Sequence, residues 1–162
     1  MTPAPNRRIV AADIMTPEPI CADPSDSART LGRLLAEHDI SGVPVVDANG
    51  RAIGVVSRAD LLKRALDGTG DRPPAFLFEV LGEFDVETGE FADEDLPRAE
   101  DLMTPEPACV NADLPVSDIA RLMGERRIHR VIVTDRSGIP VGIVTSLDLL
   151  EIFPAEIAAA GR

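Results

Sequence analysis

The pentapeptide MTPEP occurs twice in this chain, at Met15 and again at Met103, and the sequence after it repeats as well. An offset of 88 residues (103 − 15) aligns Ile14–Lys63 with Leu102–Glu151 without a gap, and nineteen of the fifty aligned positions are identical. A repeat at fixed spacing predicts one structural unit used twice. Two copies are expected to form a pseudo-symmetric pair with a cleft between them, where ligands tend to bind.

Charge narrows the range of partners. The chain has 162 residues, enough for one compact domain or two small dependent halves, and a formal net charge of −12. This balance argues against nucleic acid and anionic membrane as partners, because both need a positive surface. An anionic small ligand would need a local basic patch.

Cys21 and Cys109 occupy the same position in the two repeats. Two lone thiols favour a reducing compartment over a disulfide, and MTPAPNRRIV has no apolar run typical of a signal peptide. The apolar stretches are far shorter than the roughly 20 residues that span a bilayer. We therefore expect a soluble, cytoplasmic protein.

Each repeat contains an amphipathic helix near its start. Pro24 with Ser25 and Asp26 is expected to open the first one, and Pro115 suits the first position of the second. Apolar residues then recur at helical spacing and predict one buried face: Ala28, Leu31, Leu34 and Leu35, matched by Val116, Ile119, Leu122 and Met123.

A hairpin and a second helix follow. Val43–Asp47 and Ala52–Val56 flank an Asn49-Gly50 turn, and a helix is expected over Arg58–Leu66. The counterparts are Val131–Asp135, Pro140–Val144, Ser137-Gly138 and Ser146–Ile152. With the short extended segment Pro19–Asp23, each repeat is predicted to be strand, helix, strand, strand, helix. The fold class is therefore α/β (α+β), with the two repeats packed sheet to sheet into one module.

The MT-P opening, the ISGVPVVD hairpin and the G-[VI]-V-[ST]-x-x-D-L-L ending resemble the cystathionine-β-synthase (CBS) domain. Two copies in tandem are similar to the paired CBS, or Bateman, module that regulates many enzymes and transporters. The resemblance implies repeats at residues 8–66 and 101–153, an acidic linker at 67–100 and a tail at 154–162. It also implies a homodimer.

The pairs Ser57/Asp60 and Thr145/Asp148 lie where a strand is expected to run into a helix. A hydroxyl followed three residues later by an acid is typical of a helix N-terminal cap. A helix N-terminus also offers N–H groups and a positive dipole end to an anion. The CBS resemblance implies that the hydroxyls lie near phosphate or ribose and that the carboxylates accept bonds from ribose hydroxyls.

The run Arg126-Arg127-Ile128-His129-Arg130 is basic within an acidic protein. Arg126 and Arg127 are explained by the end of a helix, whereas His129 and Arg130 lie where the strand begins. An arginine beside a histidine forms a phosphate clamp. This stretch also resembles the adenylate-binding repeats of the AMP-activated protein kinase gamma subunit, where a His-Arg pair touches phosphate.

The first repeat has Ser41 and Gly42 at the positions of His129 and Arg130. Its site is expected to hold only a nucleoside, or nothing, or to use Arg58 or Arg51 instead. The sequence thus predicts one good site and one poor one. Aliphatic residues are candidates for the adenine wall, without indicating which repeat's wall serves which Ser/Thr–Asp pair: Ile20, Ile40, Val43, Pro44, Ala108, Ile128 and Val131.

The sequence carries no recognisable catalytic or metal site. Two histidines and two cysteines lie too far apart for the usual zinc spacing, and His38 fits a helix end. A cysteine nucleophile is less favoured than a small residue on a strand. In the linker, Phe76, Val80, Leu81 and Phe84 predict a short amphipathic helix that packs on the module or contributes a dimer contact.

The leading hypothesis is a non-catalytic regulatory module. It would bind AMP, ADP, ATP or S-adenosylmethionine between its repeats and transmit binding by a conformational change to a regulated protein partner. It would need no cofactor, although Mg²⁺ would accompany a triphosphate. The alternative is a dimeric interaction scaffold that needs no ligand, in which the Ser/Thr-x-x-Asp pairs are only caps.

Overall fold

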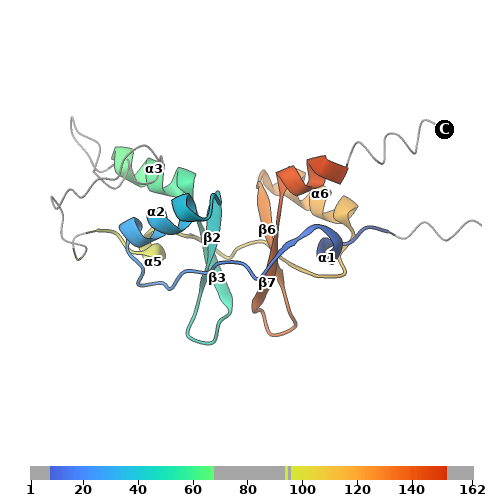
Figure 1. Ribbon diagram of the computed structural model, residues 1–162, viewed down its shortest axis with the longest axis horizontal. Helices are drawn as coiled ribbons and strands as arrows, with labels where there is room; N and C mark the ends of the chain where they lie inside the picture. The colour runs from blue at the N-terminus through green and yellow to red at the C-terminus, as the bar shows by residue number, and fades with distance from the viewer. Residues whose placement is uncertain (1–7, 68–93, 95, 153–162) are drawn as a thin grey trace, which may run out of the picture. The chain divides into compact units, whose positions relative to one another are not determined.

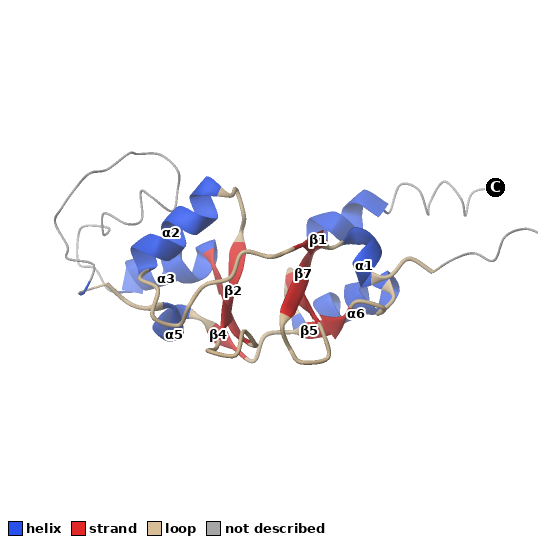
Figure 2. Cartoon of the chain, turned by 60° about the horizontal axis from the view of Figure 1, so that its bottom comes forward, coloured by secondary structure: helices blue, strands red, loops and turns tan. Residues whose placement is uncertain are grey.

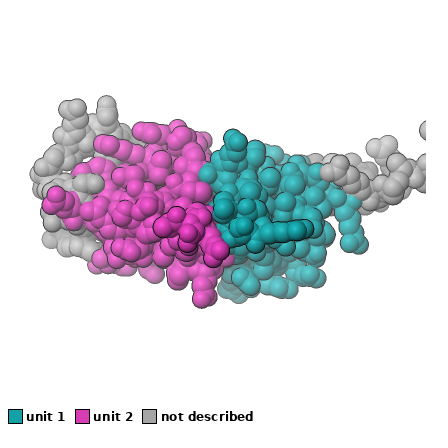
Figure 3. Space-filling view, turned by 90° about the horizontal axis from the view of Figure 1, so that it is seen from below, with its two compact units in different colours: residues 1–19, 108–162 teal, residues 20–107 magenta. Residues whose placement is uncertain are grey.

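The computed structural model describes residues 8–67, 94 and 96–152, and these belong to two compact units (Figure 3). Unit 2 is the continuous stretch Ile20–Pro107. Unit 1 joins the chain up to Pro19 to the chain from Ala108 onward. The expected mixed α and β fold with two repeats is confirmed.

Unit 2 contains a three-stranded antiparallel sheet with β3 at its centre (Figure 1). Its strands and helices are α2 (Ala28–Glu37), β2 (Gly42–Val46), β3 (Ala52–Ser57), α3 (Arg58–Asp67), α5 (Ala99–Leu102) and β4 (Thr104–Pro105). Before α2, Ala22 forms a single parallel bridge with Val45. The predicted order of strand, helix, strand, strand, helix is therefore present.

Unit 1 contains a four-stranded sheet in the order β1-β7-β6-β5. Its elements are α1 (Ala11–Ile14), β1 (Thr16–Pro17), β5 (Cys109–Asn111), α6 (Val116–Arg126), β6 (Arg130–Thr134) and β7 (Pro140–Thr145), followed by a helix over residues 146–152. Only the β5–β6 pair is parallel. Figure 2 shows β1 beside β7 at the edge of this sheet.

Strand alternation places the core of each unit under its long helices. In unit 2, Val43, Val45 and Val56 are fully buried with Leu31 and Leu61 from the two helices. Val131, Val133 and Val144 form the equivalent cluster in unit 1 with Ile119, Met123 and Leu149. Both long helices of a unit consequently lie on one side of its hairpin, as Figures 1 and 2 show.

Both hairpins turn where the sequence predicts. Gly50 and Gly138 have φ angles of 78° and 85°, in the left-handed region that favours glycine. Asp135 reinforces the second turn, because its carboxylate accepts bonds from the backbone N–H groups of Ser137 and Ile139 at 2.8 and 3.0 Å.

The first helix starts later than the sequence suggests. Pro24 and Ser25 form a turn, in which the Asp26 carboxylate accepts a bond from Asp23 N–H, and Ser27 is the N-cap whose hydroxyl accepts from Thr30 N–H. The expectation that Pro24–Asp26 opens this helix was therefore wrong, because local side-chain bonds hold a turn there. Pro115 likewise occupies the N-cap position rather than the first helical position.

The two MTPEP segments have the same local structure. Each follows a one-turn helix, contributes Thr-Pro as a two-residue strand, and ends with a glutamate in the left-handed region, at φ 51° for Glu18 and 52° for Glu106. The first segment pairs with β7 and the second with β3. Each segment thus completes the sheet formed by the hairpin of the other sequence repeat, an exchange that the sequence does not indicate.

A methionine–glycine contact fixes each segment on its sheet. A Cβ placed on Gly142 would clash with the sulfur of Met15 and lie 2.8 Å from its Cγ. Gly54 has the same relation to Met103. The repeated Met and Gly are therefore required together, because only a residue without a side chain lets the methionine lie this close.

Most of the acidic linker and the whole C-terminal tail lie outside the described residues. This includes the predicted helix over Phe76–Phe84 and the tail from residue 154. No helix among the described residues has the length and apolar character needed to cross a membrane.

We expect Gly54→Ala to destabilise the protein by about 1–3 kcal/mol, because the new methyl group overlaps Met103. Gly124→Ala is the matched control: this helical glycine has open space around it, and the change should stabilise by about 0.5–1 kcal/mol. Urea unfolding measures both. If Met103→Ala does not reduce the cost of Gly54→Ala in a double-mutant cycle, the contact is not its cause.

Candidate nucleotide site

The candidate site in unit 1 forms where β6 begins, β7 ends and the last helix begins. In the antiparallel register, Arg130 lies directly opposite Thr145. The backbone N–H of Ser146 donates to the carbonyl of His129 at 3.0 Å, which holds the helix start against the start of β6. The structure therefore brings together Thr145, Asp148 and Arg130, which lie up to 18 residues apart in the sequence (148 − 130).

Thr145 and Asp148 are joined by two short hydrogen bonds. The N–H and the hydroxyl of Thr145 both donate to Oδ2 of Asp148, at 2.6 and 2.8 Å. These bonds confirm the predicted cap at the start of the helix. Both bonds use Oδ2, so Oδ1 of Asp148 can still accept a hydrogen bond from a ligand hydroxyl. The oxygen of the Thr145 hydroxyl can also accept one, because in the cap this hydroxyl acts as a donor.

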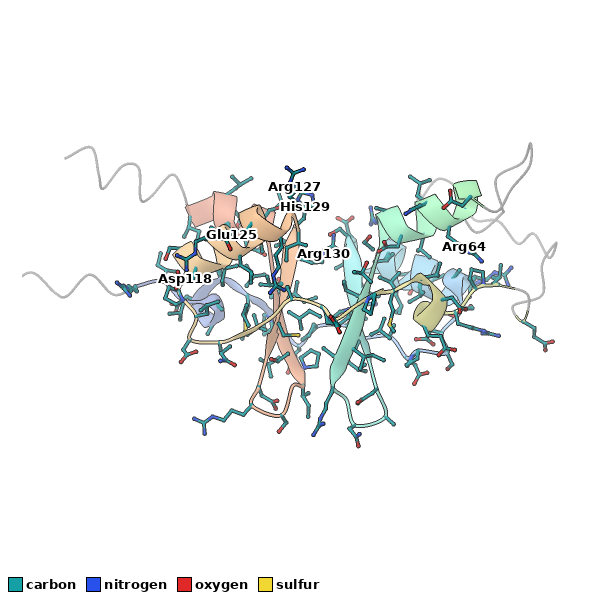
Figure 4. All side chains as sticks on the ribbon, turned by 180° about the vertical axis from the view of Figure 1, so that it is seen from behind. Arg64, Asp118, Glu125, Arg127, His129 and Arg130 are labelled. Atoms are coloured by element: carbon teal, nitrogen blue, oxygen red, sulfur yellow. The ribbon has the colours of Figure 1, made fainter. Side chains whose placement is uncertain are left out.

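The basic run lies around the end of α6. Arg127 adopts the left-handed conformation at φ 52° as the C-cap of α6, so the helix-end role expected for Arg126 and Arg127 is confirmed. His129 is exposed and Arg130 half-buried. Figure 4 shows Arg127, His129 and Arg130 gathered at the end of α6 and the start of β6.

Unit 2 has the same backbone arrangement but different side chains. Ser57 caps α3 by donating its N–H and hydroxyl to Oδ2 of Asp60 at 2.7 and 2.6 Å. Gly42 lies opposite Ser57, and Arg58 N–H donates to the carbonyl of Ser41 at 3.2 Å. The second helix cap is thus preserved, whereas Ser41 and Gly42 take the places of His129 and Arg130.

The two arginines proposed as substitutes have different positions. Arg51 precedes β3 and Ser57 ends it, so roughly 20 Å of extended strand separates them. Arg58 lies beside the cap, and its Nη2 donates to the carbonyl of Leu35 at 3.0 Å and lies 3.5 Å from the Asp39 carboxylate. Only Arg58 therefore remains as a cation of this site.

Strand alternation separates the candidate adenine-wall residues. Val43 and Val131 are buried in the helix-facing cores, on the opposite strand faces from Gly42 and Arg130. Pro44 lies on the same strand face as Gly42. The half-buried wall candidates, divided between unit 2 and unit 1, are Ile20 and Ile40, and Ala108 and Ile128. The wall candidates of each repeat thus lie in the same unit as the Ser/Thr–Asp pair of that repeat.

Ile132 is a wall candidate that the sequence reasoning missed. It follows Arg130 by two residues, so the two side chains share a strand face, and its N–H donates to the carbonyl of Ala108 at 2.9 Å. The alignment contained the signal, because Ile132 is the counterpart of Pro44 (44 + 88). The bond from Arg58 to Leu35 was also missed, and no sequence pattern indicates it.

Among the residues that the structure describes, no group of three or more His, Cys, Asp or Glu side chains is placed to hold a metal ion. Neither Cys21 nor Cys109 forms a disulfide bond, and Cys109 lies on β5. Burial raises the pKa of both thiols, so the neutral form is favoured over the nucleophilic thiolate.

This duplicated strand–helix–hairpin–helix arrangement defines a tandem α+β module with a capped helix beside each hairpin. The family model of the CBS domain matches residues 10–67 and 99–155. The chain therefore belongs to the CBS-domain family.

Two relatives extend over most of the chain. The chain is 33% identical over 129 residues to uncharacterized protein MJ1426 of Methanocaldococcus jannaschii. That match covers 74% of this chain and 76% of MJ1426. The chain is 34% identical over 156 residues to the chloroplastic CBS domain-containing protein CBSX2 of Arabidopsis thaliana. That match covers 88% of this chain but 63% of CBSX2, less than two thirds of its length.

Three solved structures have a similar fold. The CBS domain pair of protein MJ0100, in complex with 5′-methylthioadenosine and S-adenosyl-L-methionine, gives a TM-score of 0.72 at 25% identity and covers 93% of this chain and 99% of that one. CBSX2 in complex with AMP gives 0.67 at 28%, covering 90% and 96%. The cytosolic domain of the Mg²⁺ channel MgtE in complex with ATP gives 0.63 at 26%, covering 88% and 48%.

We expect Cys21 and Cys109 to react more slowly with iodoacetamide than a free thiol at pH 8, because a raised pKa lowers the thiolate fraction. The alkylation rate, followed against pH, should have its midpoint above the value of about 8.5 for an unperturbed thiol. The urea-unfolded protein serves as the control. A midpoint lower in the folded than in the unfolded chain would instead indicate an activated cysteine.

Proposed function

We propose that this protein is a non-catalytic regulatory module that binds an adenine nucleotide or a related adenosyl ligand at the candidate site of unit 1. The observation that carries the proposal is the register that sets Arg130 opposite Thr145, with Asp148 bonded to Thr145. A cation, a hydroxyl and an oriented carboxylate thus meet at one helix start. These are the groups that phosphate and ribose require.

Each group has a distinct role in this proposal. Asp148 accepts bonds from the ribose hydroxyls through its second oxygen, and Thr145 stays within reach of ribose or phosphate. Arg130 binds phosphate, with His129 beside it. Ala108 and Ile128, which are half-buried, supply the apolar surface for the base, and Ile132, which is 2% exposed, lies behind them. The complexes of relatives with AMP, ATP and S-adenosylmethionine support the ligand class.

Transmission follows from the position of the site. Thr145 precedes the helix over residues 146–152, and the first N–H of this helix, that of Ser146, donates to the carbonyl of His129 just before β6. A ligand bound there favours one orientation of this helix over others, and a protein partner can respond to that change in population. A triphosphate would bring Mg²⁺ with it. The proposal places the module in a reducing cytoplasm, where cysteines outside disulfides remain reduced.

Titration calorimetry with AMP, ADP, ATP and S-adenosylmethionine tests the ligand class and the site. Asp148→Asn keeps an oxygen for the helix cap but removes the charged acceptor, so we expect roughly 10- to 100-fold weaker binding of the preferred nucleotide. Asp60→Asn makes the same change in the cap of unit 2 and should leave that affinity unchanged.

Two different results would contradict the proposed ligand site. If the wild type binds none of the four compounds, the ligand-independent scaffold replaces the sensor, because both Ser/Thr-x-x-Asp pairs do act as caps. If a nucleotide binds but Asp148→Asn and Arg130→Ala leave its affinity unchanged, the ligand occupies another site.

A homodimer is part of the same proposal. The side of the last helix that faces solvent carries Leu147 and Leu150, which are 69% and 61% exposed. Leu62, the counterpart of Leu150 in unit 2, is also exposed. Because both units expose a leucine at the same position, a second copy offers a matching surface, as a two-fold interface requires. Covering these side chains removes apolar surface from water.

Light scattering after size exclusion should give about twice the chain mass of 17.3 kDa for the wild type. The double variant Leu147→Glu/Leu150→Glu should give the mass of one chain, because a dimer would bury four new charges. Ser117→Glu, on the exposed face of α6, is the control for added charge. A dimer that survives the double substitution does not use this helix.

A further inference from the structure

The helix that follows each hairpin, α3 in unit 2 and residues 146–152 in unit 1, has one side turned away from the core. Leu61 and Leu149 pack into the cores of their own units. Positions i, i+3 and i+4 share one side of a helix. The exposed residues at this spacing occupy equivalent positions in the two helices: Ala59, Leu62 and Lys63, matched by Leu147, Leu150 and Glu151.

Two of these three positions differ between the helices in a complementary way. Leu147 is 69% exposed and stands where unit 2 has the small Ala59. Glu151 stands where unit 2 has Lys63, so the charge is reversed. Neither Lys63 nor Glu151 forms an ion pair with another residue that the structure describes. Both charges are therefore available to a second molecule.

The net charges of the two helices differ in the same direction. Residues 146–152 carry −2 from two acids, whereas α3 carries +1, from three basic residues against two acids (3 − 2). A contact between two copies of the same helix would bring like charges together, which is unfavourable. A contact between the two different helices would set Glu151 against the partner's Lys63 and Leu147 against the partner's Ala59.

We propose that two copies of the chain associate head to tail, with the last helix of unit 1 in one copy packed on α3 of unit 2 in the other. The Glu151–Lys63 pair selects this orientation over contacts between like helices. The proposal rests on the homodimer included in the proposed function and adds its orientation. A two-fold axis forms each contact twice, because residue i meets residue j while j meets i.

Charge reversal tests the pairing, with sedimentation velocity over a dilution series giving the dimer dissociation constant. We expect Glu151→Lys and Lys63→Glu each to raise this constant roughly tenfold, because each turns attraction into repulsion in both symmetry-related contacts. The double variant Lys63→Glu/Glu151→Lys exchanges the charges at unchanged net charge. Its constant should return to within about threefold of the wild-type value.

Glu100→Lys is the matched control, because it makes the same charge change as Glu151→Lys at an exposed residue of α5. It should leave the dissociation constant unchanged. The losses caused by Glu151→Lys and Lys63→Glu should become smaller at high salt, as expected for charges at the edge of an interface.

Disulfide cross-linking tests the orientation without changing a charge. In a Cys21→Ser/Cys109→Ser background, chains carrying Ala59→Cys and chains carrying Leu147→Cys should form a covalent dimer when mixed and oxidised. A disulfide requires Cα atoms about 4–7 Å apart, so only residues that face each other react efficiently. Neither chain should form a covalent dimer by itself.

A double charge variant that dimerises as weakly as the single variants would overturn the proposal, because the two charges would then not face each other. A covalent dimer of the Leu147→Cys chain by itself would also overturn it, since the last helix would meet its own copy. Both results leave the nucleotide site and the homodimer intact. A wild type that stays monomeric at every concentration would reject the orientation and the homodimer together, and calorimetry would still decide nucleotide binding.

Discussion

The register of the β6–β7 hairpin determines which side chains of unit 1 face the candidate site and which face the core. It sets Arg130 opposite Thr145 and directs Val131 and Val144 to the core. A slip of β6 by one residue would exchange its two faces, turning Arg130 toward the core and exposing Val131 and Val133, at a cost of several kcal/mol. The tight turn at Gly138 and the aliphatic core therefore specify the site as firmly as the fold.

The exchanged MTPEP segments make the two sequence repeats depend on each other. The hairpin of the second repeat gains its edge strand from residues 16–17, and the hairpin of the first gains its edge strand from residues 104–105. Met15 and Met103 fill the space above Gly142 and Gly54. A fragment with one sequence repeat would thus lack part of its own sheet, which explains physically why the duplicated motif occurs as a pair in one chain.

The spacing of the apolar residues and the residues at the turns made most of the fold predictable. The β-branched runs around Asn49-Gly50 and Ser137-Gly138 predicted both hairpins within one residue, and the capped second helices were also correct. The exchange of the MTPEP segments was not predictable, because a two-residue strand carries no periodic signal. The cap residues could be identified from the sequence. The bond from Arg58 to Leu35 could not, because it joins positions 23 residues apart and depends on tertiary packing.

Duplication with preserved backbone geometry leaves electrostatics as the main means of making two sites differ. The turns at Asp39 and Arg127 share their φ angles and hydrogen bonds, and the caps at Ser57 and Thr145 share theirs. Shape alone would then give both sites similar affinity for one ligand. A charge difference at exposed turns acts over about 8 Å at physiological ionic strength and weakens as salt is added. Any discrimination between the two candidate sites should therefore depend on salt, whereas the contacts proposed for the base and the ribose should depend on it much less.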